Sequence, residues 1–299
     1  MSSRVPRWLP IYLGVGVIWG CSFWFIKEGL GFLSVGGVAF ARSSLGALTL
    51  LIGSRLTSTP LPRSKRVWGL LTVNGLLMNV VPALLFPLAE TRATSVLAGL
   101  MNALTPLSTI FFLTLVFRDE RLTRDQRRGL SLGLLGVLVV LGVWHGLGRN
   151  PWWTIVALLL AVTCYGVSFP FTRRYLTPLK LPPMSMATGQ LVTTTLVLSP
   201  ALLWHPHHGG TPSMGAVLAV LALGAGSSGL AYVWNFHLIE RAGSAIASTT
   251  TYLTPVVAVA VGALLLHERV TWNEPVGGVL VLLAAAWGQG WLTRRRRVA

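Results

Sequence analysis

The stretch LTPLSTIFFLTLVFRDERLT, residues 104–123, joins an apolar run to the charged signature ERLT. A similar stretch, LTPVVAVAVGALLLHERVT, occupies residues 253–271 and ends in ERVT. The equivalent glutamates, Glu120 and Glu268, are 148 positions apart in a chain of 299 residues that has only 8 acidic residues. Such a recurrence at about half the chain length predicts two copies of one structural unit.

Composition predicts that these units lie in a membrane. Hydrophobic residues make up 53% of the chain, charged residues only 11%, and the mean hydropathy is +0.67, which excludes an ordinary soluble domain. The apolar runs are about 20 residues long, enough for a helix to cross a bilayer, and lack the period-two alternation of barrel strands. We therefore predict an all-α integral membrane protein with ten transmembrane helices, over residues 8–26, 34–53, 67–89, 94–117, 127–146, 153–172, 183–204, 213–239, 243–266 and 273–292.

The basic residues predict the orientation of these helices. Of the 24 lysines and arginines, 19 fall on the side that holds both termini, and Arg42 lies within a span. The opposite side carries only Lys27, Arg92, Arg149 and Arg269. By the positive-inside rule, both termini are expected in the cytoplasm of a cell with a bacterial-type inner (plasma) membrane. The formal charge of +16 is thus explained by topology and anionic lipid, and no nucleic-acid partner is expected.

The repeat extends beyond the opening pair of motifs. FPLAE at Phe86–Glu90 matches FHLIE at Phe236–Glu240, and WGCSF at Trp19–Phe23 matches YGVSF at Tyr165–Phe169, at offsets of 150 and 146. The halves are residues 1–148 and 149–299, with five predicted helices each. Because five is odd, the second half starts on the opposite side of the membrane, so the two halves are predicted to be inverted. Inverted repeats are typical of secondary transporters.

These motifs resemble the EamA-type members of the drug/metabolite transporter superfamily over essentially the whole chain. The resemblance implies ten helices in two inverted five-helix units, with a proline in helices four and nine, here Pro106 and Pro255, and an acid after each of them. Within that family, the 12 tryptophans and the amino-terminal stretch WGCSFWFIKEGL resemble exporters of aromatic and other amino acids. The resemblance therefore implies amino-acid export.

Helical periodicity selects candidate substrate-binding residues on faces that combine polar and aromatic groups inside apolar helices. They are Trp19, Ser22, Phe23, Asn74, Met78, Asn79, Pro82, Met101, Asn102, Tyr165, Ser168, Phe169, Ser228, Tyr232, Asn235 and Tyr252. Together they offer amides, hydroxyls and aromatic rings but no acid, which suits a zwitterion or a neutral amphipathic molecule. For each residue the alternative is helix packing, since serine, threonine and asparagine also join helices in membranes.

Arg42 lies near the middle of a predicted span, where a guanidinium costs about 2.5–3.5 kcal/mol on insertion scales unless it is paired. Its repeat mate, 148 positions further on, is Gln190. Two interpretations stay open. Arg42 either makes a structural contact with carbonyl groups or binds the carboxylate of a substrate.

Three further motifs are interpreted as structural. The ERLT and ERVT signatures place Thr123 and Thr271 where they can cap the next helix. GAGSSG at Gly224–Gly229 lies in an apolar run with no preceding strand, which indicates close helix packing rather than a dinucleotide site. The histidines of WHPHH, residues 204–208, share one loop without an acidic or thiol partner, so we expect no metal and no cofactor.

The sequence thus predicts an exporter of a fairly broad range of amino acids, which works by alternating access as a facilitator or exchanger. Every acid lies between the predicted spans or, like Glu274, at the end of one, and His237 is the one titratable candidate at a membrane edge, so proton coupling is not expected. The alternative is an exporter of drugs or cations of the methyl viologen type. Motifs of intramembrane enzymes are missing, so no enzymatic activity is expected. The expected partners are the substrate and the lipid bilayer, and a monomer is favoured.

Overall fold

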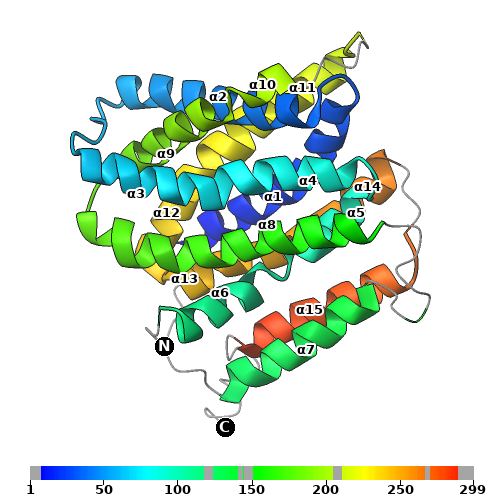
Figure 1. Cartoon of the computed structure of the whole chain (residues 1–299). Helices are drawn as coiled ribbons and strands as arrows, with labels where there is room; N and C mark the ends of the chain where they lie inside the picture. Colours follow the sequence, from blue (N-terminus) through cyan, green and yellow to red (C-terminus); the bar gives the residue numbers. More distant parts are fainter. Residues whose placement is uncertain are drawn as a thin grey trace.

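The computed structural model describes residues 8–117, 124–140, 144, 151–204, 211–266 and 270–288. Its regular elements are helices, as predicted (Figure 1). The predictions made for the ERLT signature, for Glu268, for the histidines of the WHPHH loop and for the basic carboxyl-terminal tail lie outside the described residues.

The first half contains five helical segments. The first two are α1 and α2, the third is α3 continued by η1 and α4, the fourth is α5 with α6, and the fifth is α7. Their bounds are α1 Leu9–Leu30, α2 Val35–Leu56, α3 Lys65–Gly75, η1 Leu76–Val80, α4 Val81–Glu90, α5 Ser95–Asn102, α6 Thr105–Leu115 and α7 Arg124–Val140.

The second half repeats this order. Its sixth segment is α8 with η2 and η3, the seventh α9 followed by the short α10, the eighth α11 with η4 and α12, the ninth α13 with η5 and α14, and the tenth α15. Their bounds are α8 Trp152–Phe171, η2 Thr172–Leu176, η3 Thr177–Leu179, α9 Pro183–Leu198, α10 Ala201–Trp204, α11 Met214–Ala222, η4 Leu223–Leu230, α12 Ala231–Ala242, α13 Ser244–Ser248, η5 Thr249–Tyr252, α14 Leu253–Leu265 and α15 Asn273–Gly288.

Seven of these segments are long and apolar enough to cross a membrane. The other three, α7, α9 and α15, have 17, 16 and 16 described residues. The seventh predicted span, residues 183–204, is divided into α9 and α10 at Pro200, because proline lacks the N–H that would continue the helix. The ten predicted helices therefore agree with the described segments.

Several helices continue beyond the predicted spans. α1 runs on to Leu30, the third segment ends at Glu90 and the eighth at Ala242. Glu28, Glu90 and Glu240, which the prediction placed just outside the spans, belong to the last turns of these helices. Apolar length alone underestimates such helices, because a cation near the carboxyl-terminal carbonyls stabilises turns beyond the apolar run.

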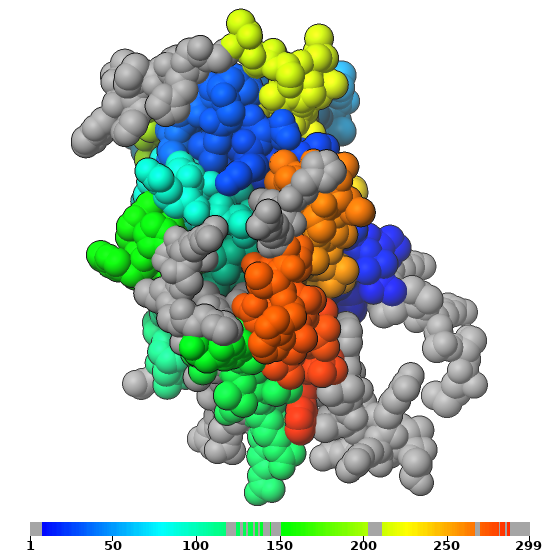
Figure 2. Space-filling view, turned by 90° about the vertical axis from the view of Figure 1, so that its right-hand side faces the viewer, coloured from blue at the N-terminus to red at the C-terminus, as the bar shows by residue number. Residues whose placement is uncertain are grey.

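The helix contacts show the exchange symmetry of the two halves. α1 packs on α12 and α14, in segments eight and nine, whereas α8 packs on α4 and α6, in segments three and four. α2 packs on η4 and α9, whereas α9 packs on α3 and α2. Exchanging the halves maps each of these contacts onto its equivalent and the contact between α2 and α9 onto itself. α7 and α15 pair with each other along one edge of the molecule (Figures 1 and 2).

The glycine of each WGCSF-type motif lies where two helices cross. A Cβ atom on Gly20 would overlap the side chain of Val257 in α14. A Cβ atom on Gly166 would overlap Ser108 in α6 and approach its backbone carbonyl carbon to 2.8 Å. The two partners are themselves equivalent, at an offset of 149. The motif recurs because the first helix of each repeat packs against the fourth helix of the other repeat, so closely that only glycine fits at the crossing.

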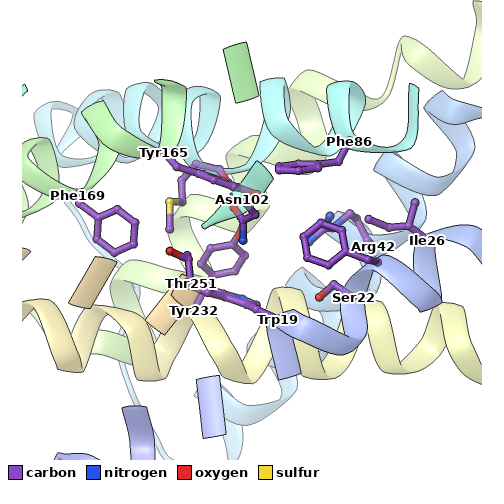
Figure 3. A pocket seen from close by; sticks show the side chains of 12 residues that line it. Trp19, Ser22, Ile26, Arg42, Phe86, Asn102, Tyr165, Phe169, Tyr232 and Thr251 are labelled. Atoms are coloured by element: carbon purple, nitrogen blue, oxygen red, sulfur yellow. Dashed lines mark hydrogen bonds between the residues drawn. The ribbon is translucent and has the colours of Figure 1, made fainter. Parts of the chain in front are cut away.

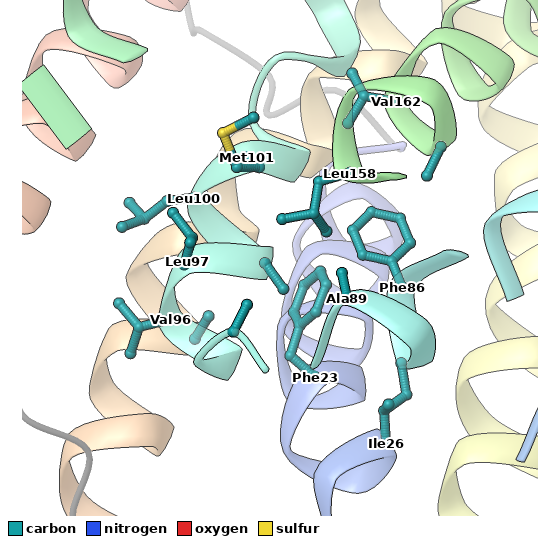
Figure 4. Close-up of a cluster of buried hydrophobic side chains, with 14 of the residues drawn as sticks. Phe23, Ile26, Phe86, Ala89, Val96, Leu97, Leu100, Met101, Leu158 and Val162 are labelled. Atoms are coloured by element: carbon teal, nitrogen blue, oxygen red, sulfur yellow. The ribbon is translucent and has the colours of Figure 1, made fainter. Parts of the chain in front are cut away.

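One apolar cluster joins segments one, three, four and six beside this crossing (Figure 4). Phe23, Phe86, Leu97, Met101 and Leu158 are all at most 4% exposed within it. The cluster fixes the spacing of four helices around the centre of the molecule.

Four segments are interrupted near their middle, at equivalent places in the two halves. π-helical turns form η1 in the third segment and η4 in the eighth. The fourth segment breaks at Ala103 and Leu104, and the ninth has the 3-10 turn η5. Pro106 and Pro255 each follow within a few residues of the break. Interrupted transmembrane helices and π-turns are frequent at binding sites.

Candidate functional site

A cavity lies among the interrupted helices (Figure 3). It is lined by Trp19, Ser22, Phe23, Ile26, Arg42, Met78, Phe86, Asn102, Tyr165, Phe169, Tyr232 and Thr251. These residues come from segments one, two, three, four, six, eight and nine, so both halves contribute. The cavity holds only about 30 Å³, room for about two water molecules. A larger molecule therefore enters only when side chains or helices move apart.

Half of the residues that line the cavity are aromatic. Trp19 meets Tyr232 at 5.9 Å between ring centroids, Phe23 meets Phe86 edge-on at 5.5 Å, and Phe86 stacks on Tyr165 at 5.9 Å. Two of the rings are held by hydrogen bonds to backbone carbonyls. Trp19 Nε1 donates to the carbonyl of Ser227 at 3.1 Å, and the Tyr232 hydroxyl donates to that of Met78 at 3.1 Å. These bonds fix flat apolar surfaces against which a ring or an aliphatic chain can pack.

Arg42 brings a positive charge into this aromatic cavity. It projects from α2, is 7% exposed, and its Nε donates to the Ser228 hydroxyl at 3.1 Å. Within the part of the chain that the structure describes, no carboxylate forms an ion pair with Arg42. Arg42 and Phe169 lie at opposite ends of the lining group in Figure 3. In the same view Ile26 and Phe86 lie beside Arg42, and Thr251 lies near Phe169. The positive charge of the cavity is thus on the side away from Phe169.

A buried polar network lies beside the cavity and ties three segments together. Asn74 Nδ2 donates to Gln190 Oε1 at 2.6 Å, and Gln190 Nε2 donates to Asn79 Oδ1. The hydroxyls of Ser168 and Thr172 donate to Asn74 Oδ1 at 2.7 and 3.2 Å. All five side chains are at most 4% exposed. The network binds the third, sixth and seventh segments to one another, as polar side chains do between helices in membranes.

The division of the chain into two equivalent halves agrees with a known family. The model of the EamA-like transporter family matches residues 7–142 and 152–287, once in each half. The chain belongs to the EamA-like transporter family.

Relatives of this EamA-like transporter cover nearly its whole length. It is 29% identical over 293 residues to the aromatic amino acid exporter YddG of Salmonella typhimurium, covering 95% of this chain and 93% of the relative. It is 25% identical over 266 residues to a probable terminal-alkyne amino-acid exporter of Streptantibioticus cattleyicolor, covering 88% and 87%. A solved crystal structure that is 21% identical superposes with a TM-score of 0.73 and covers 96% of this chain and 99% of that one. This last similarity supports the fold.

The structure divides the predicted site residues of the transporter into two groups. Those that line the cavity are Trp19, Ser22, Phe23, Arg42, Met78, Asn102, Tyr165, Phe169 and Tyr232. Those that do not are Asn74, Asn79 and Ser168 in the polar network, Ser228 behind Arg42, and Pro82, Met101, Asn235 and Tyr252, all of them buried. We keep the first group as the proposed substrate site. The hydrogen bonds of the network residues agree with the alternative interpretation, in which these side chains join helices.

Three residues that line the cavity were not selected from the sequence. Ile26 follows Ser22 by four positions, and Phe86 follows Met78 by eight, so the helical phase that selected their neighbours also contained them. Thr251 lies in η5, where its hydroxyl donates to the carbonyl of Ser248 at 2.7 Å. Its position follows from the 3-10 turn, which helical periodicity does not describe.

Two basic side chains cap helix ends at equivalent places in the two halves of the transporter. Lys27 Nζ donates to the carbonyls of Glu90 and Ala93 at 2.7 and 3.1 Å. Its mate Arg173 donates from Nη1 to the carbonyls of Ile239 and Glu240 at 3.2 and 3.1 Å. Each cation satisfies carbonyls that a helix end leaves unpaired. Because the halves are inverted, the two caps tie the first helix of each repeat to the third on opposite faces of the membrane.

The two caps are expected to differ in strength, because Lys27 is partly buried beside the fully buried Glu90, whereas Arg173 and Glu240 are exposed. Replacing Lys27 with methionine removes a charged hydrogen bond, which contributes about 1.5–3 kcal/mol to stability where it is shielded from water. Lys27→Met should therefore lower the melting temperature of the detergent-purified protein more than Arg173→Met does. Lys65→Met, at an exposed position of α3, is the matched control. Equal melting temperatures for Lys27→Met and the control would show that the Lys27 cap is unimportant.

Proposed function

We propose that this transporter exports amino acids, aromatic ones among them, by alternating access. The observation that carries the proposal is the central cavity, in which aromatic rings from both repeats face one buried guanidinium, that of Arg42. A flat apolar wall suits an amino-acid side chain, and a guanidinium suits its carboxylate. Two relatives that are named as amino-acid exporters support the same substrate class.

Alternating access is supported by the way the cavity is built. Four segments are interrupted near the cavity: the third and eighth by π-helical turns, the ninth by a 3-10 turn and the fourth by the break at Ala103 and Leu104. Prolines accompany three of these interruptions, Pro82 in the third segment, Pro106 in the fourth and Pro255 in the ninth. Such places allow a helix to bend without unfolding. The cavity is too small for an amino acid in this conformation. We therefore propose that rocking of one repeat against the other opens it to each side in turn.

The transporter is proposed to work without proton coupling, as a facilitator or exchanger. Glu90 is fully buried within the third segment, but it lies at the helix end and does not line the cavity. Among the described lining residues there is no aspartate, glutamate or histidine. A flux that strictly follows an imposed pH gradient would contradict this proposal. We also propose that both termini face the cytoplasm, from the bias of basic residues.

Reconstitution in liposomes with equal pH on both sides tests the function. Uptake of labelled phenylalanine is expected to saturate and to be inhibited by unlabelled threonine, while methyl viologen should compete poorly because it would meet Arg42. Trp19→Ala, which removes a wall ring, should reduce the flux at least about tenfold, since a large aromatic contact is lost. Trp24→Ala is the matched control, because Trp24 lies on the same helix, donates to Glu28 and does not line the cavity. Inhibition by the viologen alone would favour a cation exporter instead.

A further inference from the structure

Arg42 has unused capacity for hydrogen bonds inside the cavity. A guanidinium has five N–H donors in a planar fork, and only the Nε–H of Arg42 has a hydrogen-bond partner among the described residues, namely Ser228. The two terminal amino groups have no hydrogen-bond partner among the described residues, and Arg42 lines the cavity. A fork with both terminal groups available matches the two oxygens of a carboxylate.

The equivalent position in the other half does not offer the same site. Gln190 is neutral, and its side-chain amide is bonded on both sides, to Asn74 and to Asn79. The charge of the cavity therefore lies at one end only. A bound molecule is oriented with its negative group toward Arg42 and its apolar part toward the rings at the end of Phe169 (Figure 3).

Among the described residues, no negatively charged side chain lines the cavity to bind a positive group. Among the described acids, Glu28, Glu90 and Glu240 lie at helix ends, and Asp125 and Glu274 lie in the first turns of α7 and α15. None of them lines the cavity. An ammonium group in the cavity therefore meets only neutral oxygens and aromatic faces, and it shares the space with the positive charge of Arg42.

From this asymmetry we infer that the cavity recognises its substrate by the carboxylate and not by the amino group. The inference rests on the proposed transport function and extends it to a further substrate class, aromatic and aliphatic monocarboxylates that lack an amine, such as 2-oxo, 2-hydroxy and 3-arylpropionic acids. Arg42 is the specificity-determining residue for this class. Amines that lack a carboxylate are excluded.

Competition between three probes of one shape tests the inference with the unmodified protein. The probes are phenylalanine, 3-phenylpropionate, which lacks the amine, and phenethylamine, which lacks the carboxylate. Displacement of labelled phenylalanine from the detergent-purified full-length protein compares the probes, and isothermal titration calorimetry measures the binding of each probe on its own. Working in detergent avoids leakage of the neutral acid through liposomes. We expect 3-phenylpropionate to bind within about tenfold of phenylalanine and phenethylamine to bind at least about thirtyfold more weakly, as expected for loss of a hydrogen-bonded charge pair.

Substitution of Arg42 then assigns the selectivity to this side chain. In Arg42→Gln, the preference for 3-phenylpropionate over phenethylamine should fall at least about tenfold. Arg55→Gln, an exposed arginine in the last turn of the same helix, should leave the preference unchanged. If Arg42→Gln does not fold, the three-probe series on the unmodified protein still decides the inference.

The outcomes separate this inference from the proposed function. Binding of phenylalanine without binding of 3-phenylpropionate would overturn the inference and leave amino-acid transport intact. Binding of 3-phenylpropionate without phenylalanine would support carboxylate recognition and overturn the proposed amino-acid substrate. Equal binding of phenethylamine and 3-phenylpropionate would overturn the inference, since Arg42 would then not discriminate.

Discussion

Replacing Gly166 with alanine is expected to destabilise the protein by about 1–3 kcal/mol, the usual cost of overpacking a close contact. The added methyl group would overlap Ser108 and lie 2.8 Å from its backbone carbonyl carbon. A side chain can rotate away, but the backbone of α6 can yield only if the whole helix moves. Both α6 and α8 also pack against other helices, so the strain should appear as lost stability.

The measurement is the melting temperature of the purified protein, together with the yield of monodisperse protein. Gly69→Ala is the matched control, since a Cβ atom on Gly69 would meet nothing within 4 Å in an equally regular helix. That substitution should be neutral or slightly stabilising, because alanine favours helix more than glycine does. Gly20→Ala should resemble Gly166→Ala, since it would overlap Val257 at the equivalent crossing. A Gly166→Ala protein as stable as Gly69→Ala would show that α6 and α8 can move apart at the crossing without loss of stability.

Replacing Gln190 with leucine is expected to destabilise the protein by about 1–3 kcal/mol, because it leaves buried polar groups without partners. Asn74 would lose the acceptor for its Nδ2, and Asn79 would lose the donor to its Oδ1. Both asparagines are at most 4% exposed, so water does not readily replace the lost bonds. Leucine has nearly the volume of glutamine, which keeps the packing change small.

Thermal unfolding compares Gln190→Leu with Thr195→Val on the same helix. The Thr195 hydroxyl bonds only to the carbonyl of Leu191 within α9, at 2.8 Å, so its removal breaks no contact between segments. The control should unfold close to the unmodified protein. A Gln190→Leu protein that unfolds at the same temperature as the control would show that the network contributes little, as some hydrogen bonds in membranes do.

The sequence contains enough information for the architecture of this protein. Apolar runs of bilayer length predicted the ten helices, and the paired motifs around Trp19 and Tyr165 predicted two equivalent halves. An odd number of helices in each half required the inversion, whatever the packing. Helix ends were less predictable, because cations such as Lys27 stabilise turns that hydropathy does not count.

The candidate site was only partly predictable. Helical phase identified the faces of Trp19, Met78 and Tyr232 that meet the cavity, yet the same criterion selected Asn74 and Asn79, which lie in the polar network. In a bundle of many helices, most faces of a central helix meet protein. A polar face on a helix therefore indicates that polar groups lie opposite it. The sequence alone does not show whether those groups belong to another helix or to a substrate in a cavity.

The amino-acid sequence was sufficient to predict the membrane-spanning helices, the repeat and its inversion. The helices follow from local hydropathy and from the length of a bilayer-crossing helix, and the inversion follows from the odd number of helices in each half. Only the tertiary structure decided what the equivalent residues Arg42 and Gln190 do. Arg42 lies against Ser228, 186 positions away, and borders the cavity, whereas Gln190 is enclosed by Asn74 and Asn79. The reason is physical: whether a buried polar group is satisfied depends on which distant segments pack against it, and no local pattern in the chain contains that pairing.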